Sequence, residues 1–313
     1  MLRVGDISAL PDAARGGVLC VGNFDGVHAG HELMLRTGRA LADERRVPLV
    51  VMTFDPHPSV LLTPGRPKPP LSTLPQRAGL LAAAGADVLI VVPTTRAFLA
   101  IAAEDFLRET VCGRLGAVHL VEGANFTFGR GARGTIDTLR ALAPTFGFGV
   151  TIVPTVTRTL DDRTIVNVSS SLIRWLIERG RVRDAGTCLT RPYTLRGTVV
   201  RGAQRGRRLG YPTANLQTPQ LAPAPGVYAG SVVAGASRYV AAISVGTNPT
   251  FEGQALTVEA NLLDFAGDLY DQTIEVAFTR YLRDQQRFAG VPQLLRQLER
   301  DVALTRSHAE EAP

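Results

Sequence analysis

Cysteine is scarce in this sequence, with three residues among 313. Cys20, Cys112 and Cys188 are far apart, and each lies in an apolar or helical segment. Such spacing excludes a disulfide framework and indicates reduced thiols that serve packing, as is usual for proteins of the cytoplasm. The expected localisation is therefore cytoplasmic.

Long apolar runs are missing as well. No stretch approaches the roughly 20 apolar residues that span a bilayer, and the N-terminus lacks a charged head followed by a hydrophobic core. The sequence therefore predicts no membrane partner and a protein that stays inside the cell.

The basic residues lack the interleaved aromatics that mark nucleic-acid-binding motifs. There are 34 Lys and Arg against 28 Asp and Glu, a net charge of +6. Much of the excess lies between Arg174 and Arg208, where it would attract RNA, DNA or a small polyanion such as ATP. Without the aromatics, the composition favours a nucleotide ligand and no nucleic-acid partner.

Length and composition predict two domains. A chain of 313 residues exceeds what one core usually organises, and 45% hydrophobic with 20% charged residues is ordinary for a globular protein. The character of the segments changes near residue 187, so we expect domains of residues 1–187 and 188–313. The sequence predicts no particular oligomeric state.

Before this boundary, short segments rich in Val, Leu and Ile alternate with helical ones. Such alternation predicts a parallel sheet with right-handed crossovers, that is, a Rossmann-like α/β domain. Ligands bind these sheets beyond the carboxyl ends of the strands. The expected strands cover residues 17–22, 47–54, 87–92, 117–122 and 149–155.

After residue 191 the segments become β-rich and are separated by glycine-containing turns. Several short strands of this kind predict a small antiparallel barrel. An amphipathic helix over residues 291–305 should pack outside it. The expected strands cover residues 194–200, 226–233, 239–245, 257–264 and 273–279.

The most informative segment is residues 22–31, Gly-Asn-Phe-Asp-Gly-Val-His-Ala-Gly-His, between a strand and a helix expected at 32–46. His28 and His31 lie one helical turn apart at the helix N-terminus. There the unpaired N–H groups and the helix dipole favour an anion. Gly26 and Gly30 allow the backbone to approach it closely. The segment therefore suits a nucleotide phosphate.

Histidine spacing alone leaves two other interpretations open, a pair of surface histidines and half of a metal site. Zinc is the weaker one, because no cysteine or carboxylate recurs nearby at ligand spacing. The His-x-Gly-His pattern matches the nucleotidylyltransferase signature, and the longer segment resembles that of the prokaryotic bifunctional riboflavin kinase/FAD synthetases. This resemblance implies catalysis by His28 and His31 and nucleotide contacts from Gly22, Phe24, Gly26 and Gly30.

Two more segments of the first domain resemble the ATP site of this family. In residues 53–58, two prolines fix a rigid turn from which Asp55 and His57 project. The resemblance implies that this motif faces the nucleotide, although a plain proline-rich turn is the alternative. Residues 168–174 resemble the Ser-Ser-Thr-x-Ile-Arg sequence that closes the nucleotidylyltransferase site. A helix-capping serine, further hydroxyls and an arginine can hold a triphosphate. The implied ligands are Ser169, Ser170, Ser171 and Arg174.

Residues 122–129 resemble the flavin-site segment of the family, Gly-x-Asp-Phe-x-Phe-Gly. Asn125 replaces the aspartate and removes a possible negative charge beside a phosphate. Phe126 and Phe128 can stack against an isoalloxazine ring, although core burial explains either phenylalanine equally well. The resemblance implies flavin binding by Asn125, Phe126 and Phe128.

Residues 197–215 resemble the riboflavin kinase signature over their whole length. Glycines in this stretch let a loop wrap around phosphates, and arginines add positive charge. It ends in Pro-Thr-Ala-Asn, where the family meets Mg²⁺ and the ATP phosphates. The implied nucleotide ligands are Gly202, Arg205, Gly206, Arg207 and Pro212, and the implied metal ligands are Thr213 and Asn215.

Phosphorylation of the ribityl hydroxyl of riboflavin needs a base, because an alcohol is about as weakly acidic as water and does not ionise at neutral pH. Residues 257–265 resemble the Glu-x-His-Leu-Leu-Asp-Phe of the family and imply that Glu259 is this base. A lone glutamate on a strand is otherwise usually just solvated. Asn261 stands where histidine is usual and Asp271 where glycine is usual, which puts flavin contacts and kinase efficiency in question.

The resemblance extends over residues 17–306. It implies a bifunctional enzyme that converts riboflavin to FMN and FMN to FAD, with ATP as co-substrate and Mg²⁺ as cofactor. The FMN phosphate is already a charged nucleophile at neutral pH, since its second pKa is about 6. Adenylyl transfer therefore needs alignment and charge neutralisation rather than a base. The alternatives are an FMN adenylyltransferase with a degenerate kinase domain and a non-catalytic flavin- or RNA-binding protein.

Overall fold

The chain forms two compact units. The computed structural model describes residues 1–5, 7, 10–65, 67–202, 206, 209–247 and 256–310. One unit comprises Met1–Lys68 and Leu74–Thr157, and the other comprises Pro69–Thr73 and Arg158–Pro313. Neither unit is therefore a single continuous stretch of chain.

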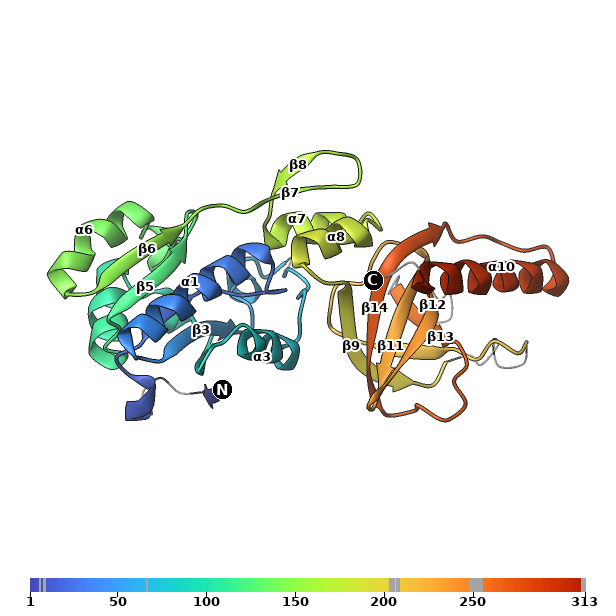
Figure 1. The fold of residues 1–313 in the computed structure, drawn as a ribbon, viewed down its shortest axis with the longest axis horizontal. Coiled ribbons are helices and arrows are strands. Elements are labelled where there is room, and N and C mark those ends of the chain that lie inside the picture. The colour runs from blue at the N-terminus through green and yellow to red at the C-terminus, as the bar shows by residue number, and fades with distance from the viewer. Residues whose placement is uncertain are drawn as a thin grey trace. The chain divides into compact units, whose positions relative to one another are not determined.

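A six-stranded parallel sheet organises the first unit, in the order β1-β4-β3-β2-β5-β6 (Figure 1). All five strands expected from the sequence are present, so the Rossmann-like prediction is confirmed. The edge strand β1 was not expected, since three residues carry little periodic signal. The strands are β1 (Leu2–Val4), β2 (Val18–Val21), β3 (Leu49–Asp55), β4 (Val88–Pro93), β5 (His119–Gly123) and β6 (Gly149–Val153).

Helices connect these strands, as the crossovers between parallel strands require. The longest, α1, begins three residues before the helix expected at 32–46. The helices are α1 (Ala29–Arg45), α2 (Ser59–Leu62), α3 (Leu74–Ala83), α4 (Arg96–Leu99), α5 (Ala103–Asp105) and α6 (Ile136–Phe146). Shorter or irregular turns are η2 (Asp12–Ala14), the π-helical η3 (Phe106–Arg114) and η4 (Arg130–Ala132).

Both faces of this sheet are covered. Successive side chains of a strand point to opposite faces, so Leu19 and Val21 of β2 join one core cluster and Val18 and Cys20 join the other. The first cluster packs against η3 and α6, and the second packs against α1 and α3. A strand buried on both faces reads as a continuous apolar run, which is why β2 was predictable.

The strand order reverses direction between β2 and β5. From β2 the chain adds β3 and β4 on one side, and it later adds β5 and β6 on the other. Ligands bind parallel sheets at such a switch point, in the crevice beyond the carboxyl ends of the strands. The segments that follow β2 and β5 carry the His28–His31 and Asn125–Phe128 motifs, so topology brings both to this edge.

The second unit contains a closed barrel of six antiparallel strands, in the order β10-β13-β12-β11-β14-β9. The barrel and its helix confirm the fold expected after residue 191. Only β10 was not expected, because its four residues are hidden in the Pro-Thr-Ala-Asn motif. The strands are β9 (Tyr193–Val200), β10 (Ala214–Gln217), β11 (Gly226–Ala234), β12 (Ser237–Thr247), β13 (Leu256–Leu262) and β14 (Thr273–Arg283).

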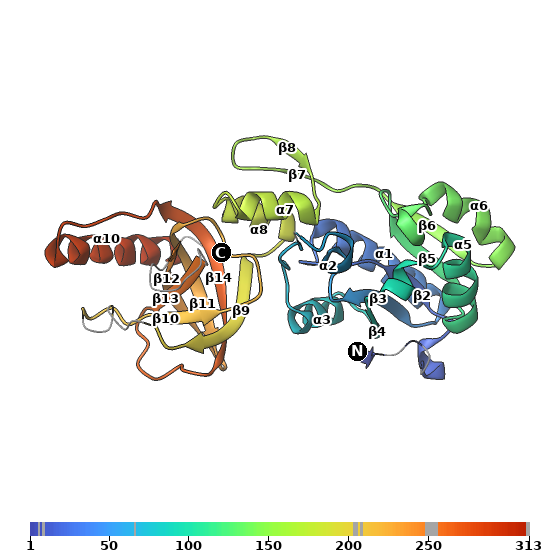
Figure 2. The same ribbon diagram turned by 180° about the vertical axis from the view of Figure 1, so that it is seen from behind.

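Helix α10 (Val291–Glu310) packs against β11 and β12 on the outside of the barrel (Figure 2). Helices α7 (Ser170–Ile177) and α8 (Val182–Leu189) precede the barrel, and α8 contacts β9 and β14. Strands β7 (Thr157–Thr159) and β8 (Ile165–Asn167) form a two-stranded sheet before them.

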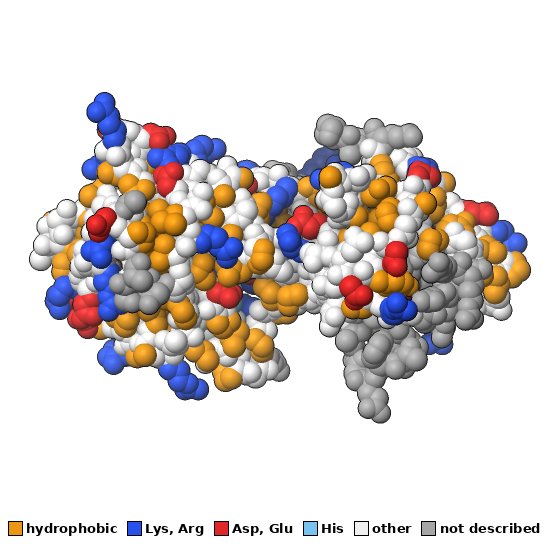
Figure 3. Space-filling model, turned by 90° about the horizontal axis from the view of Figure 1, so that it is seen from below, with side chains coloured by type: hydrophobic (Ala, Val, Ile, Leu, Met, Phe, Trp, Pro, Cys, Tyr) orange, Lys and Arg blue, Asp and Glu red, His pale blue; other side chains and the backbone are white. Residues whose placement is uncertain are grey.

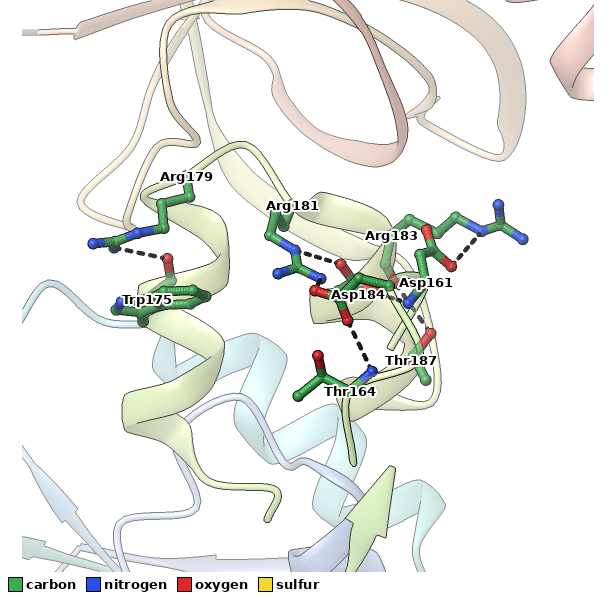
Figure 4. Close-up of polar contacts among 9 residues, drawn as sticks. Asp161, Thr164, Trp175, Arg179, Arg181, Arg183, Asp184 and Thr187 are labelled. Carbon is green, nitrogen blue, oxygen red and sulfur yellow. Dashed lines mark hydrogen bonds and ion pairs between the residues drawn. The ribbon is translucent and has the colours of Figure 1, made fainter. Parts of the chain in front are cut away.

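Arg181 ties the turn between β7 and β8 to α8 (Figure 4). Its Nε donates to Asp184 Oδ2 over 2.7 Å, and its Nη2 donates to Asp162 Oδ2 over 2.8 Å. Asp184 Oδ1 accepts the N–H of Asp161 over 2.8 Å. Two residues after the end of α7, the guanidinium of Arg179 lies 4.1 Å from the ring centroid of Trp175. Part of the excess of arginine in this stretch is therefore used in local contacts.

The short segment Pro69–Thr73 is built into the second unit. Gln220 Nε2 donates to the carbonyl of Leu71 over 2.8 Å, and the N–H of Leu221 donates to Pro70 over 3.1 Å. Leu71 is 3% exposed. These contacts fix a stretch that lies in the proline-rich part of the sequence.

On the face of the molecule shown in Figure 3, blue basic and red acidic side chains are interspersed among the coloured residues. Among the residues that the structure describes, no helix combines the length and the apolar character needed to cross a membrane.

Candidate active sites

A tight turn leads from β2 into α1. Its backbone has positive φ at Phe24 (46°), Gly26 (81°) and Val27 (39°). Such angles are unusual for phenylalanine and especially for a β-branched valine, and they persist only where the surroundings enforce them. Phe24 is fully buried, and the N–H of Val27 donates to its carbonyl over 3.1 Å. The turn is thus a fixed platform for the next residue, His28.

His28 and His31 cap α1 reciprocally. His28 Nδ1 accepts the N–H of His31 over 3.4 Å, and His31 Nδ1 accepts the N–H of His28 over 3.3 Å. The two rings stack, with centroids 3.7 Å apart. Because each Nδ1 is an acceptor, the proton of each neutral ring lies on Nε2. Both imidazoles are thereby set as Nε2–H donors at a helix N-terminus.

Gly30 makes room for this arrangement. A Cβ at Gly30 would lie 3.2 Å from Nδ1 and Cε1 of His28. The sequence attributed Gly30 to close approach by a ligand, and the structure shows that it also accommodates the His28 ring.

The end of β3, the strand beside β2, carries the Asp55 and His57 motif. Asp55 is exposed, whereas His57 Nδ1 accepts the N–H of Ser59 over 3.1 Å and lies 2.9 Å from its Oγ. Buried Arg77 of α3 donates to Thr53 Oγ1 over 3.2 Å. The strand end is therefore held firmly, and the turn presents Asp55 at the carboxyl edge of the sheet.

A pocket of about 520 Å³ opens beside the segment that follows β5. Asn125 and Phe126 line it together with Thr135 and Arg140 of the α6 region. Phe128 lies behind it in the core, 7% exposed, and its ring stacks on Phe126 with centroids 5.4 Å apart. Of the three residues predicted to bind flavin, two reach the pocket and the third supports one of them.

Glu122, the residue before Gly123 in β5, was missed by the sequence analysis. It is 1% exposed, and its Oε1 accepts the N–H of Val21 over 2.8 Å. Burial raises the pKa of this carboxyl well above its usual value. A carboxylate directly after the apolar run Leu-Val was the available signal, since glutamate is rarely fully buried without a partner.

Ser169 caps α7, with its Oγ accepting the N–H of Leu172 over 3.2 Å. Arg174 is buried, and its guanidinium donates to the carbonyls of Pro69 over 3.0 Å and Ser170 over 3.3 Å. These residues belong to the second unit and His28 and His31 to the first.

In the barrel, β10 and β13 pair with Asn215 opposite Glu259. Val258, Ala260 and Leu262 of β13 are buried, so the alternation of the strand turns Glu259 to the other face. Thr213 Oγ1 donates to Glu259 Oε2 over 3.2 Å. The candidate base and the candidate metal ligands thus converge.

Asn261 lies two residues after Glu259 and therefore on the same face of β13. Its Nδ2 donates to the carbonyl of Pro212 over 2.7 Å. The residue that departs from the family pattern thus holds the same Pro-Thr-Ala-Asn segment that Glu259 contacts.

Glycine is required at two points of the preceding loop. A Cβ at Gly202 would lie 2.5 Å from the side-chain amide of Asn215, and one at Gly206 would lie 2.3 Å from the carbonyl of Tyr211. Neither contact is tolerable, so both glycines let the loop approach the segment that holds Thr213. Arg205 and Arg207 lie outside the described residues.

A pocket of about 330 Å³ adjoins this cluster. Pro212, Thr213 and Asn215 line one side, and residues 265–270, ending in Tyr270, line the other. The guanidinium of Arg201 lies 5.0 Å from the Tyr270 ring centroid. Glu259 is hydrogen-bonded to Thr213, which lines this pocket.

The donor set here suits a hard cation. Thr213 and Asn215 offer a hydroxyl and an amide oxygen beside the Glu259 carboxylate, and Mg²⁺ prefers oxygen ligands. Gly202 leaves the space next to the Asn215 amide that a Cβ would fill. In the part of the chain that the structure describes, no group of three or more His, Cys, Asp or Glu is placed to hold a metal ion.

Two family models match the chain. The model described as FAD synthetase matches residues 10–171, and the model described as riboflavin kinase matches residues 189–309. Together the two matches cover most of the chain, the first ending at residue 171 and the second beginning at residue 189.

Curated relatives match along nearly the whole chain. A bifunctional riboflavin kinase/FMN adenylyltransferase of Listeria monocytogenes is 34% identical over 294 residues, which cover 93% of this chain and 91% of the relative. Proteins of the same description from Bacillus subtilis and Escherichia coli K12 are 34% and 33% identical, each covering 91% of this chain and 90% of the relative. A crystal structure of a Streptococcus pneumoniae protein described as a macrolide-efflux protein superposes with a TM-score of 0.86. It is 32% identical and covers 97% of this chain and 98% of its own.

Proposed function

The chain belongs to the bifunctional riboflavin kinase/FMN adenylyltransferase family, and from that membership we propose how its residues divide two reactions. The enzyme phosphorylates riboflavin with ATP to give FMN, and it transfers the adenylyl group of ATP to FMN to give FAD and pyrophosphate. The assignment of residues to each step is the proposal.

We assign adenylyl transfer to the junction of β2 and α1, and the reciprocal cap of His28 and His31 carries this assignment. With both Nδ1 atoms used as acceptors, the two Nε2–H groups can donate to phosphate oxygens of ATP. These donors and the α1 N-terminus stabilise the negative charge that develops as pyrophosphate leaves. No base is needed, since the FMN phosphate is already ionised.

Other nucleotide contacts in this reaction rest on the family resemblance. Asp55 is exposed at the carboxyl edge of the sheet, one strand away from His28, which supports a role beside the nucleotide. Ser169, Ser170, Ser171 and Arg174 are proposed ATP ligands because of their motif. Arg174 already donates two hydrogen bonds to carbonyls, which fix its side chain in one orientation.

We propose that the pocket beside Asn125 and Phe126 holds the isoalloxazine of FMN. The Phe126 ring offers an apolar surface for stacking, and Phe128 supports it from behind. The position of this pocket after β5, next to the sheet switch point, supports a substrate that must meet ATP at the same edge.

We assign riboflavin phosphorylation to the barrel, with Glu259 as general base. Its Oε2 already accepts a hydrogen bond from the Thr213 hydroxyl. A carboxylate in this position can instead accept the proton of a substrate hydroxyl. Thr213, Asn215, Gly202 and Gly206 are then proposed to bind the phosphates of ATP.

Mg²⁺ is proposed as the cofactor of this site, held by Thr213 and Asn215. When bound, it supplies positive charge that neutralises the transferring phosphoryl oxygens. Thr213 and Asn215 orient the phosphates, and Gly202 leaves space beside them because it has no side chain. Thr213 also holds the proton acceptor Glu259.

We also propose a functional boundary between residues 187 and 188. We further propose that the protein is cytoplasmic and works without a nucleic-acid partner. The compact units divide at other positions, because α7, α8 and Pro69–Thr73 belong with the barrel.

A time course with riboflavin, ATP and Mg²⁺ tests the proposal as a whole. Chromatography should show FMN before FAD in the purified protein, and EDTA should stop FMN formation. The assignment of residues is tested by whether substitutions at Glu259 and at His28 each remove one product only. Equal loss of both products in either variant would contradict two separate sites.

A further inference from the structure

A buried carboxyl, that of Glu122, lies at the switch point of the sheet and has no part in the proposed reactions. It is 1% exposed, and its Oε1 accepts the N–H of Val21 over 2.8 Å. Among the described residues, no ion pair involves Glu122. Burial of an ionised glutamate without a paired cation costs free energy. The cost is avoided if the carboxyl is neutral, and it is accepted only where function requires the charge.

Its place in the ladder is specific. Strands β2 and β5 pair through Val18 with His119 and Leu19 with Leu120, and the ladder then stops. In the same register Val21 lies opposite Glu122. Here the side chain of Glu122 supplies the acceptor that a backbone carbonyl would supply in a continuous ladder. The two strands can therefore part without leaving the Val21 N–H unsatisfied.

The parting of the strands opens the crevice in which ligands of parallel sheets bind. Val21 is the last residue of β2, and the strained turn that delivers His28 follows directly. On the other strand, Glu122 is three residues before Asn125 of the flavin pocket. One side chain thus joins the base of the proposed ATP turn to the base of the proposed flavin segment.

The ionisation state of this group matters because both substrates are anions. Burial raises the pKa of Glu122 well above its usual value, with the hydrogen bond from Val21 a smaller opposing effect. The titratable group that interacts with it from β2 is the thiol of Cys20, whose pKa is raised by its own burial and then by Glu122. In the neutral acid, Oε1 is the carbonyl that accepts from Val21 and the proton lies on Oε2.

We propose that Glu122 is a positioning residue of the adenylyl-transfer site that acts as a neutral acid. It fixes Val21, and through Val21 the His28 turn, without placing a negative charge beside ATP and FMN. The inference rests on the adenylyl-transfer site proposed above. Glu122 would thus affect the rate of adenylyl transfer through its ionisation state and not through contact with a substrate.

The test compares Glu122→Gln with Glu122→Met in the full-length protein. Glutamine keeps a carbonyl acceptor and cannot ionise, whereas methionine has a similar size and no acceptor for the Val21 N–H. We expect Gln to retain the kcat/KM for FAD formation within about threefold and Met to lower it by about tenfold or more, the range for a buried donor that loses its acceptor. Riboflavin phosphorylation by the same samples is the internal control and should not change.

The pH profile supplies a readout that a purely structural role would not move. In the parent protein, FAD formation should fall as the pH rises through the pKa of Glu122, and in Glu122→Gln this limb should disappear. Cys20→Ala is the matched control for the neighbouring thiol and should keep the limb. Glu122→Gln remains informative if Glu122→Met does not fold.

Two results would overturn the inference. One is a Glu122→Met protein with the parent KM and kcat for FMN, and the other is a Glu122→Gln protein as impaired as Glu122→Met, which would mean that a negative charge is required. Retention of FAD formation in His28→Ala would instead contradict the proposed site itself, so the two failures are distinguishable.

Discussion

The hydroxyl of Thr213, the residue before β10, donates a hydrogen bond over 3.2 Å to Oε2 of Glu259 on the neighbouring strand β13. The contact joins the proposed metal ligand to the proposed base. It holds the carboxylate beside Thr213, which lines the pocket, and the lone pairs of the same hydroxyl oxygen are left to bind a cation.

Glu259→Gln should abolish most of the riboflavin kinase activity. The amide keeps the shape and can still contact Thr213, but it cannot accept a proton, and general-base catalysis is typically worth about 10²–10⁴-fold. FAD formation from supplied FMN should be unchanged. Glu299→Gln, an exposed position on α10, is the matched control. Kinase activity within about tenfold of the parent would remove Glu259 from its role, given that general-base range.

Substitution of His28 can separate the helix cap from the donor. Asparagine is a good N-cap and should preserve stability, whereas alanine should lower the free energy of unfolding by about 1 kcal/mol. Both remove the Nε2–H donor, so both should lower FAD formation by about 10²-fold or more, the size of effect for a lost transition-state donor. Riboflavin phosphorylation should survive in both. Full activity of His28→Asn would show that the cap alone is needed.

Asn261 should support kinase activity through the carbonyl of Pro212. Asn261→Leu loses the 2.7 Å hydrogen bond and should raise the KM for ATP in riboflavin phosphorylation. Asn261→His restores a ring N–H at this position and should remain close to the parent enzyme. Steady-state kinetics with riboflavin and ATP measure both. A leucine variant with parental KM would show that the contact does not position Pro212–Asn215.

Asp271 has a left-handed backbone, with φ of 61°. This explains why the family favours glycine there, and aspartate is among the few other residues that tolerate the conformation. Asp271→Val should lower the free energy of unfolding by about 1–2 kcal/mol, while Asp271→Gly should change it little. Thermal unfolding of the three proteins tests this. Kinase activity in Asp271→Gly should match the parent, because the backbone is already in the conformation that glycine adopts.

The raised pKa of Glu122 makes the stability of the first unit depend on pH. In the pH range between the usual glutamate value and the folded value, the native state holds a proton that the unfolded state releases, so stability falls as pH rises. Glu122→Gln removes this contribution. Its free energy of unfolding relative to the parent should therefore increase between pH 5 and pH 8.

Denaturant titrations at the two pH values measure this difference. Glu44→Gln, an exposed position on α1, is the control and should show no such trend. A Glu122→Gln difference that is constant with pH would mean that the carboxyl titrates alike in the two states.

Much of the fold could be predicted because its strands are buried on both faces or alternate strictly. β2 and residues 49–52 of β3 are continuous apolar runs, and β13 alternates between buried valine, alanine and leucine and the motif residues Glu259 and Asn261. The sequence predicts that the glycines of the kinase motif let a loop wrap around phosphates, which stays a prediction. At Gly202 the structure shows a close approach to Asn215, whose side-chain amide would lie 2.5 Å from a Cβ.

The remaining features depend on partners far away in sequence. Glu122 resembles a solvated strand end until its bond to Val21, 101 residues earlier, is known. Phe126 and Phe128 look alike in the motif, and only packing separates the pocket-lining ring from the core ring. No periodicity marks Pro69–Thr73 as part of the second unit, since its contact with Gln220 spans 149 residues.

The segment Pro69–Thr73 prevents a simple cleavage of this protein into its two units. Because Pro69–Thr73 is hydrogen-bonded to Gln220 and Leu221 while the chain on both sides of it belongs to the first unit, no single cleavage releases either unit intact. A polypeptide nicked after Thr157 keeps these five residues on its N-terminal fragment and their partners on its C-terminal fragment. The two fragments should therefore co-purify under native conditions and separate only in denaturant, as in a protein reconstituted from complementary pieces.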